Sequence, residues 1–299
     1  MAYKKYLTLI LAVLLAFSLC ACGDNAEQTS LHPTIAEPGS DAAADLSLPE
    51  SVNVEAGAQD VCVYELVIDR ERAKAQVESC FGIVLDEATK TPTELGDMYN
   101  TDEYTVQIDN ESGYWTYSLL NKTPTKAGAS LSDDAALGIA KKFIEENKLW
   151  PEEITNIKVV DQYGLNEALE YGVDTKTVYF YPQIGGKTVL GVYRISIDID
   201  LTGKITSVFY LVNPIGEATQ ASLKSRADIA ADVEARNYSA SFSQDLTDAK
   251  INDCKLCYYA DGVENGGKTY LYPVYVLMGE GKAADGSTET FDLIIDAQK

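Results

Sequence analysis

Apolar residues between positions 131 and 147 recur at the spacing that places them on one side of an α-helix. Ser132 stands directly before this pattern, where its hydroxyl can cap free backbone N–H groups, and two aspartates follow it in the first turn. The pattern therefore predicts a capped helix with one buried face. The residues expected on that face are Ala136, Ile139, Ala140 and Phe143.

Alternating apolar and polar residues follow this helix as far as position 212. Such alternation is typical of half-buried β-strands, and it predicts strands at 176–184, 188–200 and 205–212. A glycine-containing turn at 201–204 precedes the last of them. The region 126–215 is therefore expected to be a helix packed on an antiparallel sheet.

The same order of elements returns in the last third of the chain. Ser225 and Asp228 form a predicted capping pair, and Ile229 and Val233 supply a buried helical face. Because strands separated by glycine-containing turns follow this helix too, we expect residues 216–299 to be a diverged repeat of the preceding unit. Its strands are expected at 250–259, 269–278 and 288–295.

A further unit is expected at residues 61–125. A strand pattern at 61–69 and a helix pattern at 70–81 come first, and the strand patterns at 103–109 and 114–120 flank a glycine-containing turn. The polar connector at 121–129 contains proline and glycine and is placed as a domain boundary. The chain is therefore predicted to be an α+β protein built from tandem helix-on-antiparallel-sheet units.

The central unit resembles a known module. Its capped helix, the run Gly-Val-Tyr-Arg-Ile-Ser-Ile-Asp-Ile-Asp-Leu-Thr-Gly-Lys-Ile at 191–205 and the following strand are similar to the PepSY-type module of peptidase propeptides. They are equally similar to the repeats of YycH/YycI-type extracytoplasmic regulators of sensor kinases. The resemblance implies a fold of this kind and a non-enzymatic role in which the protein binds and restrains a sensor kinase or a secreted peptidase.

The first 21 residues carry the features of a bacterial lipoprotein signal peptide. A short basic segment precedes an apolar run at 7–19, which is shorter than the roughly 20 residues needed to span a bilayer. The sequence Leu-Cys-Ala-Cys-Gly that ends it resembles a lipobox with Cys22 as the diacylated residue. The alternative is an ordinary secretory cleavage site. The lipobox predicts a protein anchored to the extracytoplasmic face of the cell membrane, whereas YycH/YycI-type proteins usually carry a membrane helix there.

Residues 22–60 differ in composition from the rest of the chain. Acidic residues recur among alanine, serine, proline and glycine with no lysine or arginine from Gly23 onwards, and no apolar period is evident. This segment is predicted to be a disordered acidic tether. It holds His32, the only histidine, so the predicted folded units contain none.

Charge and motifs narrow the functions to be considered. The formal net charge of −22 repels phosphate backbones, so no nucleic-acid partner is expected. Asp198 and Asp200 match the D-x-D-x-T pattern of some phosphatases, but the turn that follows them favours two aspartates of a β-hairpin. We expect no catalytic residue, metal site or cofactor. An envelope-bound hydrolase that uses carboxylates is the chief alternative, because acidic residues are abundant.

Four cysteines lie in the predicted folded units. Cys62 on a strand and Cys80 on the following helix can form a disulfide in an exported protein or remain two buried thiols, and the sequence leaves both alternatives open. Cys254 and Cys257 have the spacing of a redox or zinc motif. Because residues three apart in a strand face opposite sides, they are interpreted as two separate small apolar residues.

Tyrosine supplies the last candidate site. Tyr179 and Tyr181 are expected to share one strand face, and Tyr270 and Tyr272 another. Paired rings of this kind form a platform for a peptide or a cell-wall glycan fragment. The alternative is the half-exposed face of an antiparallel sheet, which tyrosine favours without any ligand.

Overall fold

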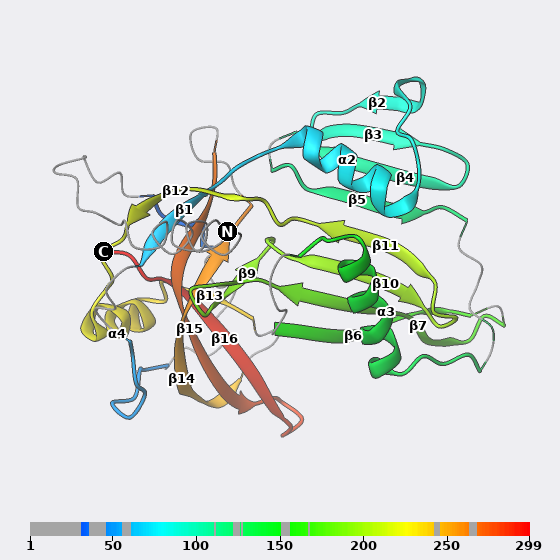
Figure 1. Cartoon of the computed structure of the whole chain (residues 1–299). Helices are drawn as coiled ribbons and strands as arrows, with labels where there is room; N and C mark the ends of the chain where they lie inside the picture. Colours follow the sequence, from blue (N-terminus) through cyan, green and yellow to red (C-terminus); the bar gives the residue numbers. More distant parts are fainter. Residues whose placement is uncertain are drawn as a thin grey trace, which may run out of the picture.

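The computed structural model of the chain describes residues 31–35, 46–55, 61–110, 112–121, 126, 128–150, 156–166, 168–241, 246–262 and 268–299 (Figure 1). The predicted signal peptide and Cys22 lie outside these residues. The fold is mixed α+β with far more strand than helix, which confirms the predicted class in this coarse form. No helix in the described ranges is long and apolar enough to cross a membrane.

Eight antiparallel strands form the first sheet, and the chain fills it from both edges inward, so that its two halves meet in the middle. In spatial order they are β2 (Lys90–Pro92), β3 (Gly96–Asn100), β4 (Tyr104–Asp109), β5 (Trp115–Leu119), β11 (Ile205–Tyr210), β10 (Ile195–Asp200), β7 (Tyr171–Tyr181) and β6 (Asn156–Leu165). β5 pairs with β11, so the strands on either side of the boundary predicted at 121–129 belong to one continuous sheet.

Two helices cover one face of this sheet, α2 (Arg70–Phe81) and α3 (Asp133–Glu146) (Figure 1). The predicted start of α3 is confirmed, since the Ser132 hydroxyl accepts a hydrogen bond from the Ala135 backbone N–H. The buried stripe differs from the prediction, because Ile144 is buried while Phe143 and Ile139 are only partly buried. Phe143 turns sideways onto Phe81 of α2, with ring centroids 5.7 Å apart. The two helices lie side by side, which the sequence of one unit could not reveal.

The second sheet combines strands from all parts of the chain. In spatial order they are β12 (Ile215–Gln220), β1 (Cys62–Leu66), β15 (Thr269–Lys282), β14 (Thr247–Ala260), β9 (Lys187–Gly191) and β8 (Gln183–Ile184), while β16 (Thr288–Asp296) and β13 (Ser239–Ala240) branch from β15. α4 (Arg226–Ala235) begins with the predicted capping box between Ser225 and Asp228. The core of this sheet is separate from that of the first.

The strand predicted at 188–200 is divided between the two sheets. Its first half is β9, which pairs in parallel with β14, and its second half is β10 of the first sheet. Gly191 lies at the break with φ 84°, and a Cβ there would stand 2.1 Å from the Ala260 carbonyl oxygen. Glycine therefore permits a close backbone approach that no other residue allows.

The predicted tether is wrong for part of its length. Leu46 and Val52 are buried in the second core, and Arg226 of α4 donates hydrogen bonds to the Val52 carbonyl at 2.5 Å and to the Pro49 carbonyl. Apolar residues stand in two pairs at 46/48 and 52/54 on either side of a proline-containing turn, a pattern too short to mark a buried segment by periodicity alone.

The segment 31–35 also contacts the second sheet. His32 Nδ1 lies 2.5 Å from the Asp296 carboxylate at the end of β16, and the Gln298 side chain donates to the Leu31 carbonyl at 2.5 Å. The remainder of the predicted tether lies outside the described residues.

Candidate functional site

The hairpin of β6 and β7 carries four exposed apolar side chains on a strongly acidic protein. Tyr163, Leu165, Leu169 and Tyr171 are 59, 58, 78 and 76% exposed, respectively. We call these four residues the hairpin patch. Large apolar side chains gathered in this way on a surface are typical of a binding site.

The strand register places most of the hairpin patch on one face. Tyr163 stands opposite Val173 and Leu165 opposite Tyr171, and the rings of Tyr163 and Tyr171 stack with centroids 5.9 Å apart. Since side chains alternate along a strand, these residues share the face of the sheet that α3 covers further along. Leu169 lies in the turn, with a positive φ of 61°.

A pocket of about 320 Å³ opens beside the hairpin patch, between the hairpin and the segment that leads into α3. Its apolar lining comes from Leu131, Val173 and Leu201. Its charged lining comes from Lys126, Lys176 and Glu170. We call this the hairpin pocket.

Lys176 is fixed at the base of the hairpin pocket. It is 7% exposed, and its ammonium group donates to the carboxylates of Asp133 in the first turn of α3 (2.6 Å) and Asp161 on β6 (2.5 Å). These hydrogen bonds, the one to Asp133 first, raise the pKa of Lys176 above its ordinary value. The ion pairs therefore link the hairpin to the start of α3 beside the pocket.

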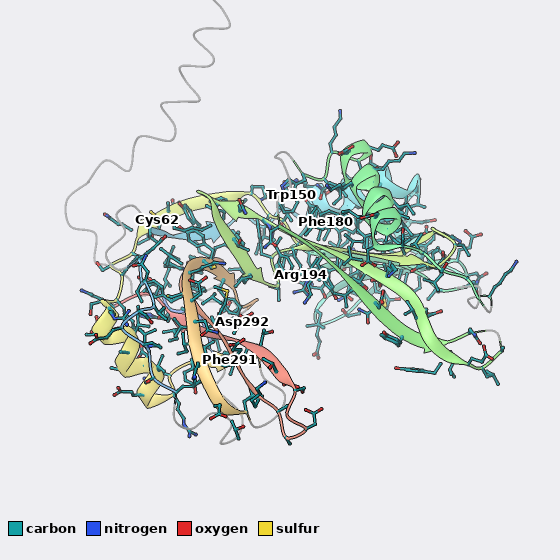
Figure 2. The ribbon with its side chains drawn as sticks, turned by 90° about the horizontal axis from the view of Figure 1, so that it is seen from below. Cys62, Trp150, Phe180, Arg194, Phe291 and Asp292 are labelled. Atoms are coloured by element: carbon teal, nitrogen blue, oxygen red, sulfur yellow. The ribbon has the colours of Figure 1, made fainter. Side chains whose placement is uncertain are left out.

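The opposite face of the first sheet carries Tyr179 and Tyr181, as predicted from their spacing. Their rings stack with centroids 6.3 Å apart, and the guanidinium of Arg194 lies over Tyr179 at 5.6 Å. It also lies 5.7 Å from the Phe209 ring. In Figure 2 Phe180 lies toward the helices and Arg194 toward the other side of the sheet. Both tyrosines are partly buried, as is common for tyrosine on the half-exposed face of an antiparallel sheet.

The second tyrosine pair differs. Tyr270 is partly buried, but Tyr272 is 1% exposed, because β15 is an interior strand with neighbours on both sides. The two rings touch at 5.9 Å. Tyr272 therefore offers no exposed ring to a ligand.

Cys62 and Cys80 are not brought together as a disulfide. Cys62 lies in β1 of the second sheet, whereas Cys80 lies in α2 against the core of the first, and both are thiols. A disulfide between Cys62 and Cys80 would require β1 and α2 to pack together in one unit. The strand instead pairs with β12 and β15.

Cys254 and Cys257 confirm the interpretation as separate apolar residues. Both lie in β14, but Cys254 packs in the main core of the second sheet and Cys257 in a small cluster with Val274 and Val276. Burial raises the pKa of Cys80 and Cys254 to about 12 and that of Cys257 to about 11.

The raised pKa values of these thiols predict that the free energy of unfolding falls at alkaline pH. Above about pH 9 the thiols of the unfolded chain ionise while Cys80, Cys254 and Cys257 stay protonated in the folded chain, so the unfolded state binds fewer protons. The free energy of unfolding should then fall, by about 1 kcal/mol per thiol at pH 9.5 relative to pH 7.5.

Urea denaturation followed by circular dichroism across this range measures the fall. A Cys254→Ala/Cys257→Ala variant should show a shallower decline, and an equal decline in both proteins would contradict the assignment.

Asp198 and Asp200 lie in the predicted hairpin between β10 and β11, which is antiparallel. The Asp198 carboxylate accepts a hydrogen bond from Thr177 Oγ1 at 2.7 Å, and Asp200 accepts from the backbone of Thr202 and Lys204 in the turn. Both aspartates therefore have structural partners. Within the described part of the chain, no cluster of three or more His, Cys, Asp or Glu side chains is arranged to hold a metal.

Comparison with known proteins finds remote structural neighbours. No protein-family model matches the chain, and no curated protein matches its sequence. An uncharacterised protein from Eubacterium rectale matches with a TM-score of 0.48 and 12% identity, over 79% of this chain and 83% of that one. The Bacillus megaterium YpeB C-terminal domain matches with a TM-score of 0.33 and 11% identity, over 76% of this chain and 98% of that one.

The sequence did not point to the hairpin patch, although a signal existed. Large apolar residues at 163, 165, 169 and 171 stand symmetrically about a polar turn, which is the pattern of a hairpin with an apolar face. The hairpin pocket has no comparable signal, since its lining comes from three separate segments of the chain.

Proposed function

We propose that this protein is a lipid-anchored extracytoplasmic binding protein that docks a protein partner through the hairpin patch. The observation that carries the proposal is the patch itself, four apolar side chains each more than half exposed. The partner class, a sensor kinase or a secreted peptidase, comes from the resemblance of the central unit to PepSY and YycH/YycI-type modules.

The tandem-repeat interpretation belongs to the same proposal. In the central unit α3 precedes β6, β7, β10 and β11 of the first sheet, and in the last third α4 precedes β13, β14, β15 and β16 of the second. This repeated order supports two diverged PepSY-like units. The first unit shares its sheet with β2 to β5, and the second recruits β1, β9 and β12.

The position of the hairpin patch favours a protein partner over the bilayer that would hold the anchor. Cys22 stands nine residues before Leu31, a length that spans at most about 30 Å when extended. Because Leu31 and His32 contact the end of the second sheet, an anchor at Cys22 would hold that sheet near the membrane. The tip of β6 and β7 lies at the far end of the molecule (Figure 1), so it would face away from this membrane.

A photo-crosslinking experiment in intact cells tests this function. Tyr171 is replaced with p-benzoylphenylalanine, which resembles tyrosine in shape, and the control places the same residue at Val84, 78% exposed on the loop after α2. We expect a discrete protein adduct from position 171 and none from position 84. Identical products from both positions, or none from either, would contradict the proposal.

A further inference from the structure

The hairpin pocket adjoins the hairpin patch on the same face of the first sheet. Val173 lines the pocket and stands directly opposite Tyr163 of the patch. Patch and pocket therefore form one continuous surface that runs from the exposed tip toward the start of α3.

The pocket has the dimensions and lining of a site that receives a large apolar side chain of a bound peptide, here called the anchor residue. Its volume of about 320 Å³ is at the lower end of the range for ligand sites and accommodates one or two large side chains. Leu131, Val173 and Leu201 supply the apolar contacts. Because two hydrogen bonds to carboxylates hold Lys176, this side chain of β7 is already positioned before a segment binds.

The charged side chains around the pocket favour an acidic residue beside the anchor residue of the bound peptide. Lys126 and Lys176 line it together with a single acidic residue, Glu170, although the protein as a whole carries 22 more acidic than basic groups. Lys176 is already paired with Asp133 and Asp161, whereas Lys126 is exposed at the rim. A carboxylate on a bound segment would therefore meet a cation at Lys126.

We infer that the hairpin pocket binds a linear peptide segment of the partner that carries a large apolar anchor residue with an acidic residue beside it. The apolar side chain enters between Leu131, Val173 and Leu201, and the acidic residue pairs with Lys126. Flanking apolar residues of the segment lie on the hairpin patch. The inference rests on the proposed function and names the kind of sequence that the partner presents.

The test begins with selection from a displayed library of random linear twelve-residue peptides on the full chain. Selected peptides are then measured by fluorescence polarisation against the unmodified protein and three variants. Val173→Trp fills the pocket. Val160→Trp is the matched control, because Val160 is also a partly buried valine of this hairpin but pairs with Thr177 on the opposite face. Lys126→Glu reverses the charge at the rim.

We expect an apolar residue next to aspartate or glutamate to be enriched. Val173→Trp should weaken binding by about thirtyfold or more, the effect of losing a central anchor contact. Lys126→Glu should weaken it by about two- to fivefold, as for an exposed ion pair, and Val160→Trp should change it less than twofold. Circular dichroism and urea midpoints show that each variant is folded.

Equal binding by the Val173→Trp and Val160→Trp variants, or selection of peptides without an apolar anchor, would overturn the inference. The crosslinking experiment at Tyr171 is independent of this result. If it yields a partner while the selected peptides ignore Val173, the binding function stands and the role of the pocket falls.

Discussion

Replacing Trp115 with alanine is expected to lower the free energy of unfolding by about 3–5 kcal/mol. Trp115 is fully buried in β5, the strand that joins the two halves of the first sheet. Its ring stacks on Tyr210 of β11 with centroids 5.2 Å apart and meets Phe81 of α2 edge-on at 6.3 Å. Its indole N–H donates to the Gln76 side chain at 3.3 Å. The substitution therefore removes contacts between both halves and a helix at once.

Urea denaturation followed by circular dichroism measures this loss. The control is Trp150→Ala, because Trp150 is the other tryptophan and is only partly buried at the margin of the same core. Its loss should be clearly smaller. Equal losses for the two variants would mean that Trp115 does not bridge the halves of the sheet.

The second large effect is expected at Gly279 in β15. A Cβ at this position would stand 2.4 Å from the Lys250 carbonyl oxygen and 2.3 Å from the ring of Phe291, its cross-strand partner on β16. Phe291 is 2% exposed and lies over the glycine backbone (labelled in Figure 2). Gly279→Ala should therefore destabilise the protein by about 1–3 kcal/mol, because neither the backbone oxygen nor the buried ring can easily move.

A matched substitution isolates the cause. Gly138 lies on the exposed side of α3, and a Cβ there meets no atom within 4 Å. Gly138→Ala should stabilise the protein by about 0.5–1 kcal/mol, as expected for alanine in a helix. The two glycine-to-alanine changes should thus have opposite signs in chemical denaturation. If Gly279→Ala were neutral, the close contact between β15 and β16 would be wrong.

Local sequence signals accounted for the helices. The caps at Ser132 and Ser225 involve residues only three positions away, so the sequence contains everything that determines them. The start of α2 at Arg70 and its end at Phe81 also agree with the prediction. The same locality explains the hairpin of β10 and β11, where Asp200 bonds to its own turn.

The partners of the strands could not be predicted in this way. The alternation of apolar and polar residues in β1 and β9 indicates that each strand has a buried face. The same alternation would be found whichever sheet supplied the neighbouring strands. Both strands join the second sheet rather than the unit suggested by their place in the sequence. The hairpin pocket depends on the same long-range arrangement, because Leu131, Val173 and Leu201 meet only after the first sheet has formed.

The place of β1 in the second sheet determines the order in which the chain can fold. β1 is the first described strand, yet its neighbours are β12 and β15 from the last third of the sequence. During synthesis or export from the N-terminus, this strand cannot have both neighbours until nearly the whole chain has emerged. The first sheet contains no strand after Tyr210, so all of its strands can pair before the rest of the chain has emerged. Loss of the final strands would therefore leave β1 with β12 as its remaining neighbour and turn an interior strand into an edge strand, so the two ends of the chain depend on each other.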